Sequence, residues 1–150
     1  MLSDEAYMQQ ALVLAERAAE YGEVPVGAIV VSAEGEVIGR GYNQPLGTHD
    51  PTAHAEIRAL RDAASNIGNY RLSGCRLYVT IEPCSMCAGA LVHARIAELI
   101  FGAKESRAGV VCSQQQLLDA DWLNHRCQWR GGVLDDECAQ RMKDFFAARR

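Results

Sequence analysis

The chain has 150 residues, of which 49% are hydrophobic and 23% charged, and its net charge is −4. This length and composition fit one globular domain, 1–150, and exclude an intrinsically disordered chain. No apolar run approaches the roughly 18 residues that a membrane-spanning helix needs. The opening residues, MLSDEAYMQQ, lack the bases of a signal peptide. We therefore expect a cytoplasmic protein with no membrane segment.

The first third of the chain predicts a helix followed by a hairpin. Residues 4–20 carry apolar side chains at helical spacing, and Ser3 or Asp4 suits the helix cap. Two apolar runs follow, over 25–32 and 36–42, separated by the turn residues Glu34-Gly35. Two such runs joined by a tight turn predict an antiparallel pair of strands.

The rest of the chain alternates helices with strands. A helix is predicted over 53–66, because Asp50-Pro51-Thr52 is a start signal and Gly68 a stop signal. The further predicted elements are a strand over 77–81, a helix over 85–94, a strand over 99–102, a short helix over 114–119 and a last helix over 135–148. This alternation predicts an α/β domain whose central sheet is covered by helices on both faces.

Six cysteines raise the question of disulfides or metal binding. They are Cys75, Cys84, Cys87, Cys112, Cys127 and Cys138. In a cytoplasmic chain, cysteines bind metals, take part in catalysis or pack in the core more often than they form disulfides. Only Cys84 and Cys87 have the spacing of metal ligands, and we expect the other four to be structural.

Two short motifs bring together residue types that bind metals. His54-Ala55-Glu56 opens one predicted helix, and Pro83-Cys84-Ser85-Met86-Cys87 stands where a strand passes into another. A gap of two residues lets both cysteine thiolates face one ion, and the free N–H groups at a helix start stabilise thiolates. His54, Cys84 and Cys87 are therefore the candidate ligands of a zinc ion.

The number of candidate ligands indicates catalysis. Structural zinc sites use four protein ligands, whereas catalytic sites use three and leave one position to water. Zinc lowers the pKa of such a water from about 15.7 toward roughly 7. Glu56 is two residues from His54 and can reach the water without being a ligand, so we predict that it shuttles the proton.

Two other interpretations of these motifs stay open at this point. The two cysteines alone are also compatible with a redox pair, although that leaves His54 and Glu56 unexplained. A zinc ion that only holds the fold together needs a fourth protein ligand. The nearest candidates for that ligand, Cys75 and Cys112, lack ligand spacing.

The His-x-Glu and Pro-Cys-x-x-Cys motifs together resemble the signature of the cytidine deaminase-like superfamily. Nearly the whole chain further resembles the bacterial tRNA-specific adenosine deaminases. The segments that carry this resemblance are EVPVGAIVV (23–31), GYNQPLGTHDPTAHAEI (41–57), NYRL (69–72), LYVTIEPCSMCAGALVHARI (77–96), FGAKESRAG (101–109), LNHR (123–126) and DFF (144–146). The resemblance implies a three-layer α/β/α cytidine deaminase-like fold with a central mixed sheet of about five strands.

The resemblance also implies an activity and the roles of individual residues. The family converts adenosine to inosine at the wobble position of a tRNA anticodon, as a homodimer with one zinc ion per subunit. Asn43 matches an asparagine that hydrogen-bonds the target base, while Val26 and Ala55 match the lining of the base pocket. Glu105 stands where the family often has an aspartate, in a loop that touches the flipped-out anticodon nucleotides.

The charge distribution bears on the substrate class. Residues 141–150 carry Arg141, Lys143, Arg149 and Arg150 against Asp144, a net charge of +3. From charge alone, a solvated helix end is the favoured explanation of such a run, and the overall charge of −4 argues against a generally basic surface. An alternative substrate is a small molecule such as free cytidine, cytosine or guanine, on which the same zinc chemistry acts.

Overall fold

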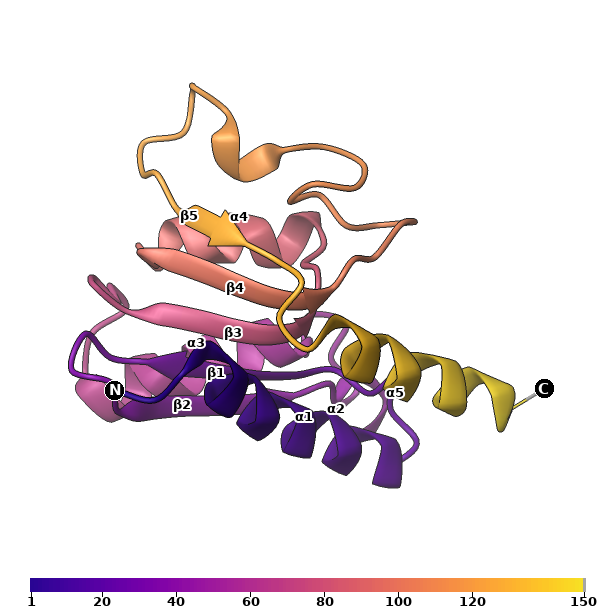
Figure 1. Cartoon of the computed structure of the whole chain (residues 1–150). Coiled ribbons are helices and arrows are strands. Elements are labelled where there is room, and N and C mark those ends of the chain that lie inside the picture. The colour runs from indigo at the N-terminus through magenta and orange to yellow at the C-terminus, as the bar shows by residue number, and fades with distance from the viewer. Residues whose placement is uncertain (150) are drawn as a thin grey trace.

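The computed structural model of the chain describes residues 1–149, so that Arg150 of the basic terminus lies outside the described residues. A five-stranded sheet in the order β2-β1-β3-β4-β5 forms the centre of the molecule (Figure 1). The strands are β1 (Gly27–Val31), β2 (Val37–Tyr42), β3 (Arg76–Ile81), β4 (Glu98–Ala103) and β5 (Gln128–Arg130). β1 is antiparallel to both neighbours, whereas β3, β4 and β5 run parallel. The sheet is therefore mixed, as expected.

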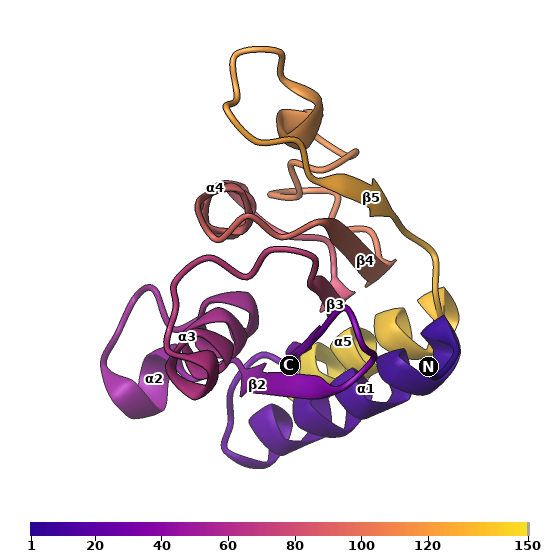
Figure 2. The same ribbon diagram turned by 90° about the vertical axis from the view of Figure 1, so that its left-hand side faces the viewer.

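Helices cover both faces of this sheet. α1 (Asp4–Glu20) and α5 (Asp135–Ala147) lie on one face, and α3 (Ala55–Ile67) and α4 (Ser85–His93) lie on the other (Figure 2). The four-residue α2 (Pro45–Thr48) sits beside α3, and a single 3-10 turn spans Leu117–Asp119. The predicted three-layer α/β/α architecture is confirmed. None of the described helices is long and apolar enough to cross a membrane.

Apart from shifts of one or two residues at the ends of other elements, four elements differ from the sequence prediction. α3 begins at Ala55 instead of residue 53, because the Asp50 carboxylate accepts hydrogen bonds from the Thr52 backbone N–H and hydroxyl and holds a turn ahead of the helix. The short helix predicted over 114–119 shrinks to the turn at Leu117–Asp119. β5 and α2 were not predicted, because elements of three and four residues are too short to show a hydrophobic periodicity.

Close contact between α3 and β2 fixes the position of α3. A Cβ atom on Gly41 would stand 2.5 Å from both the Ala55 carbonyl oxygen and the Ala59 nitrogen. One on Gly39 would stand 2.5 Å from the Ala59 carbonyl oxygen. Because these two glycines carry no side chain, the α3 backbone lies directly on the strand, and the first turn of α3 is held against the sheet.

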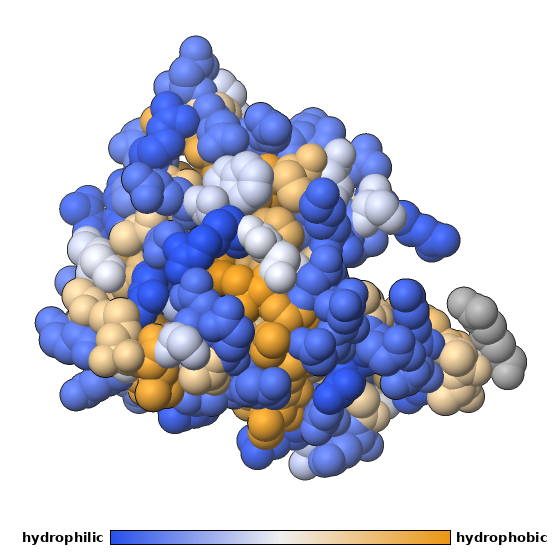
Figure 3. Space-filling view, in the orientation of Figure 1, coloured by the Kyte–Doolittle hydropathy of each residue, from blue (hydrophilic) through white to orange (hydrophobic). Residues whose placement is uncertain are grey.

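A polar cluster closes the opposite end of the sheet, where β3 and β4 begin. The Tyr78 hydroxyl donates to Asp4 at 2.6 Å, and the Arg130 guanidinium donates to Asp4 at 2.6 Å and also pairs with Glu98. These contacts tie the start of α1 to β3, β4 and β5. The face formed by α1 and α5 is mainly hydrophilic around a central apolar strip (Figure 3).

Candidate metal centre and active site

The two predicted motifs meet at the edge of the sheet where β3 ends. His54 is the residue that caps α3, and Cys84 is the residue that caps α4, with Cys87 in the first turn of α4. β3 leads into the Cys84 segment, and β1 pairs antiparallel with β3, so that residues just before β1 lie at the same edge. The sheet thus brings two helix N-termini together, and their positive ends favour thiolates.

The side chains of the three candidate ligands have the spacing of a zinc site. The His54 Nδ1 atom lies 3.6 Å from the Cys84 Sγ atom and 3.5 Å from the Cys87 Sγ atom. Bonds of about 2.3 Å to sulfur and 2.0–2.1 Å to nitrogen at tetrahedral angles separate the ligand atoms by about 3.5 Å. Among the described residues, this is the one group of three or more such side chains close enough to hold a metal. A zinc ion held here keeps one position open.

The electrostatics of the two thiols support metal binding. The hydrogen bond from the Cys87 side chain, aided by His54 and by the Cys87 backbone N–H, lowers the pKa of the Cys84 thiol to about 3. The same hydrogen bond and burial raise the pKa of Cys87. Cys84 is therefore the more acidic of the two thiols, and a metal held here would require both thiols to lose their protons.

Glu56 lies in the first turn of α3, with only 4% of its surface exposed. Burial raises the pKa of its carboxyl to about 7, and the negative charge of Cys84 adds to this increase. A carboxyl group with this pKa accepts and releases a proton readily at neutral pH, which is the property that a proton shuttle needs.

A cavity of about 190 Å³ opens beside the ligands. His54, Glu56 and Cys84 line it together with Val26, Asn43 and Glu105, so six of the predicted site residues surround one space. The other lining residues are Val24, Ile81, Glu82, Ala108 and Met142. The cavity is smaller than the 300–1,000 Å³ typical of pockets for drug-sized ligands, and it suits a group of the size of one base.

Two predicted residues have specific hydrogen bonds. The Asn43 Oδ1 atom accepts the Ala55 backbone N–H at 2.9 Å and so satisfies the start of α3. The Ala55 side chain is fully buried in the core, and its backbone N–H is the donor to Asn43. The Glu105 carboxylate turns back on its own loop and accepts the backbone N–H groups of Arg107 and Ala108.

Met142 and Glu82 are two of the lining residues that sequence reasoning did not assign to the site. Met142 of α5 reaches the cavity, although its position between Cys138 and Phe145 at helical spacing is typical of a residue on a core face. Phe145 packs between α1 and α5 instead, and neither Phe145 nor Phe146 lines the cavity. Glu82, just before Pro83, is the other of these two residues. Burial by itself raises the pKa of its carboxyl, but hydrogen bonds from Cys112, Ser113 and Glu105 outweigh burial and lower it.

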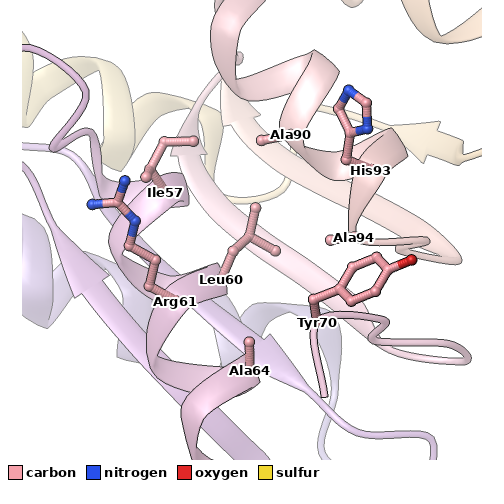
Figure 4. Close-up of a pocket in the computed structure, with 8 residues that line it drawn as sticks. All are labelled: Ile57, Leu60, Arg61, Ala64, Tyr70, Ala90, His93 and Ala94. Atoms are coloured by element: carbon pink, nitrogen blue, oxygen red, sulfur yellow. The ribbon is translucent and has the colours of Figure 1, made fainter. Parts of the chain in front are cut away.

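A second, mainly apolar hollow of about 350 Å³ lies between α3 and α4 (Figure 4). Its lining residues are Ile57, Leu60, Arg61, Ala64, Tyr70, Ala90, His93 and Ala94. Tyr70 is 64% exposed there. Another hollow, beside Trp122 and Leu123, adjoins it through His93. This outer face of the α3 and α4 layer therefore carries two adjoining hollows with a mainly apolar lining.

The fold and the three-ligand centre define a zinc-dependent deaminase of the cytidine deaminase-like class. Residues 1–103 match the family described as the cytidine and deoxycytidylate deaminase zinc-binding region. The chain is 48% identical over 98% of its length to the tRNA-specific adenosine deaminase of Haemophilus influenzae, of which it covers 85%. It is 40% identical over 97% of its length to the enzyme of the same name from Bacillus subtilis, of which it covers 90%. The chain belongs to the family of the tRNA-specific adenosine deaminases.

A solved structure agrees with this assignment. It comes from a study of A-to-I editing by tRNA:A34 deaminases at the wobble position of transfer RNA, and it superposes with a TM-score of 0.87 at 40% identity. The superposition covers 91% of this chain and 98% of the other. The likeness therefore extends past the family match at 1–103 into the C-terminal part of the chain.

We predict that replacing Cys87 by Ser removes the bound metal. The substitution deletes one of three ligands, so the zinc content, measured by mass spectrometry of the purified protein, should fall from about one ion per chain to near zero. Cys112→Ser is the matched control, because Cys112 lies outside the ligand cluster, and it should keep its zinc. Full zinc retention by Cys87→Ser would contradict the ligand assignment.

Proposed function

We propose that this chain, as one domain over 1–150, hydrolyses adenosine to inosine at the wobble position of a tRNA anticodon. The observation that carries the proposal is the three-ligand centre with the buried Glu56 beside it in one cavity. The substrate is inferred from the relatives, which are tRNA-specific adenosine deaminases. A centre with four protein ligands would leave no position for water, so the geometry favours a catalytic site over a structural one.

His54, Cys84 and Cys87 hold the zinc ion in this proposal. When bound, zinc supplies Lewis-acid activation of water at neutral pH. Glu56 accepts the proton of the water that adds to the purine carbon. It delivers this proton to the neighbouring ring nitrogen, then takes the second proton from the new hydroxyl group on the carbon and passes it to the amino group, which leaves as ammonia as the carbonyl forms. Its pKa of about 7 matches both transfers, and its burial keeps the proton from bulk solvent.

Asn43 is proposed to orient the base through one half of its amide. Its Oδ1 atom already accepts the Ala55 N–H, so in this proposal the Nδ2 amino group is the part of the side chain that meets the base. An amino group donates hydrogen bonds, so Asn43 recognises an acceptor atom on the base. Val26 and Ile81 supply apolar walls, and Glu105 belongs to the loop proposed to contact the flanking nucleotides.

The size of the cavity and its position fit a base extruded from a loop. A nucleotide in an anticodon loop is partly unstacked, which lowers the cost of moving it into a pocket. Arg141 and Lys143 of α5 and Arg149 just after it are proposed to contribute to phosphate binding, although Arg141 also pairs with Glu16 of α1. This basic end is local, in keeping with the net charge of −4.

The central test is inosine formation. We expect the zinc-loaded protein to form inosine in an anticodon stem-loop that presents adenosine at the wobble position, detected by nuclease digestion and mass spectrometry. Glu56→Gln should keep its zinc and fold but lose at least about a hundredfold in kcat, because the proton shuttle is gone. Turnover of free cytidine or guanine without any inosine in the stem-loop would contradict the proposal.

A pair of variants separates the two roles of Asn43. In Asn43→Asp, a carboxylate oxygen still accepts the Ala55 N–H, but the donor to the base is absent. We therefore expect zinc content and thermal stability to stay near wild type, while kcat/KM for the stem-loop falls about tenfold or more. Asn43→Ala should lose both stability and activity. Wild-type kinetics for Asn43→Asp would refute the contact with the base.

A cytoplasmic homodimer is the second part of the proposal. The apolar outer face between α3 and α4, with the exposed Tyr70, supports an interface in that place, because large apolar patches mark association sites. The hollow adjoins Ile57, the neighbour of Glu56, so a partner subunit would approach the catalytic layer.

We expect Tyr70→Glu to shift the protein from dimer to monomer in analytical ultracentrifugation, since it places a charge in the apolar face. Tyr21→Glu is the matched control: Tyr21 is similarly exposed, at 69%, but it follows α1 on the other side of the sheet. A monomeric wild type, or equal effects of both variants, would contradict an interface at this face.

A further inference from the structure

Glu82 is a buried carboxylate outside the proposed chemistry. It follows β3 directly, two residues before Cys84, and only 3% of its surface is exposed. A buried charge is costly unless hydrogen bonds compensate for it. For Glu82 all of these hydrogen bonds come from one segment, the loop over 104–113 that follows β4.

The loop over 104–113 encloses the carboxylate with five donors. The Oε2 atom accepts the backbone N–H groups of Val111, Cys112 and Ser113 at 3.0, 2.9 and 2.9 Å. The Oε1 atom accepts the Glu105 backbone N–H at 3.1 Å and the Ser113 hydroxyl. Both ends of the loop are therefore fastened to one side chain.

The backbone of the loop also packs directly on Glu82. A Cβ atom on Gly109 would stand 2.4 Å from the Glu82 Cδ atom, so only glycine allows this approach. The Val110 N–H donates to the Pro83 carbonyl at 3.1 Å, next to the ligand Cys84. The loop is thus built against the same short segment that supplies a metal ligand.

The contacts continue from Glu82 to the wall of the cavity. Glu82 holds the Glu105 amide, and the Glu105 carboxylate in turn accepts the amides of Arg107 and Ala108. Glu105 and Ala108 both line the cavity beside the metal ligands. A change at Glu82 therefore shifts the cavity wall formed by Glu105 and Ala108. It leaves the Glu56 carboxylate unaltered.

We propose that Glu82 is a positioning residue for substrate binding, which sets the loop over 104–113 at a defined distance from the metal centre. The inference rests on the proposed function, because the loop is taken to contact the nucleotides around the target base. Glu82 contributes no atom to proton transfer in this proposal. It sets the affinity for the polynucleotide, and the metal centre sets the rate of the chemical step.

The variant Glu82→Gln tests this role selectively. The glutamine carbonyl oxygen can keep the three N–H groups of Val111, Cys112 and Ser113, and its NH₂ group can donate to the Ser113 hydroxyl. It cannot accept the Glu105 N–H, because two donors would face each other. The substitution therefore releases one end of the loop, the end that carries Glu105.

Two readouts are measured on the zinc-loaded full chain. We expect KM for the anticodon stem-loop to rise about tenfold, with kcat within about twofold of wild type and zinc content unchanged. In hydrogen exchange, the Glu105 amide should exchange at least about tenfold faster, while amides of β1 keep their protection. Ser113→Ala, which removes one donor of five, should raise KM by a smaller factor.

Glu98→Gln is the matched control, since it neutralises a glutamate at the opposite end of the sheet and should leave KM unchanged. An unchanged KM for Glu82→Gln overturns the proposal. So does a loss of zinc or faster exchange throughout the sheet, because Glu82 would then support only the fold. If the wild type forms no inosine, the proposed function fails, and the exchange of the Glu105 amide still decides whether Glu82 holds the loop.

Discussion

The meeting of two helix N-termini at the end of β3 is the constraint on which the rest of the structure depends. His54 and Cys84 cap their helices, and the His54 Nδ1 atom lies 3.5–3.6 Å from the two cysteine Sγ atoms, the separation of nitrogen and sulfur ligands around a tetrahedral zinc ion. This spacing depends on α3 lying directly on β2, which Gly39 and Gly41 permit. The sheet order then matters to function because it sets the distance between two motifs that are thirty residues apart.

Three buried glutamates around the site illustrate how partners decide the role of a side chain. Glu82 has five hydrogen-bond donors from one loop, and Glu23 accepts the backbone N–H groups of Leu46 and Gly47 at the start of α2. Both carboxylates hold backbone segments in place by accepting their N–H groups. Glu56 faces the cavity and the metal ligands instead, and burial raises its pKa to about 7. Its proton affinity is thus suited to chemistry, while the other two carboxylates hold backbone segments in place.

Most of the fold was predictable, because the long elements have clear periodicity. α1 was predicted with its exact bounds, and α3, α4 and α5 differ by no more than two residues at either end. β5 forms only because Gln128–Arg130 pairs with the free edge of β4, and no local sequence pattern predicts this contact. The metal ligands were predictable from the spacing of His54, Cys84 and Cys87. Met142 and Glu82 were not, because they reach the site through tertiary packing.

By itself the sequence determined the donor set, the acid beside it and the family, because these depend on residue type and spacing along the chain. Only the tertiary structure decided which polar atoms remain available. It showed that the Asn43 oxygen is occupied by the Ala55 amide, and that the Glu105 carboxylate folds back on its own loop. It also revealed that Glu82 fastens that loop. The physical reason is that tertiary packing determines which groups distant in sequence become hydrogen-bond partners. The hydrophobic periodicity of the sequence does not predict them.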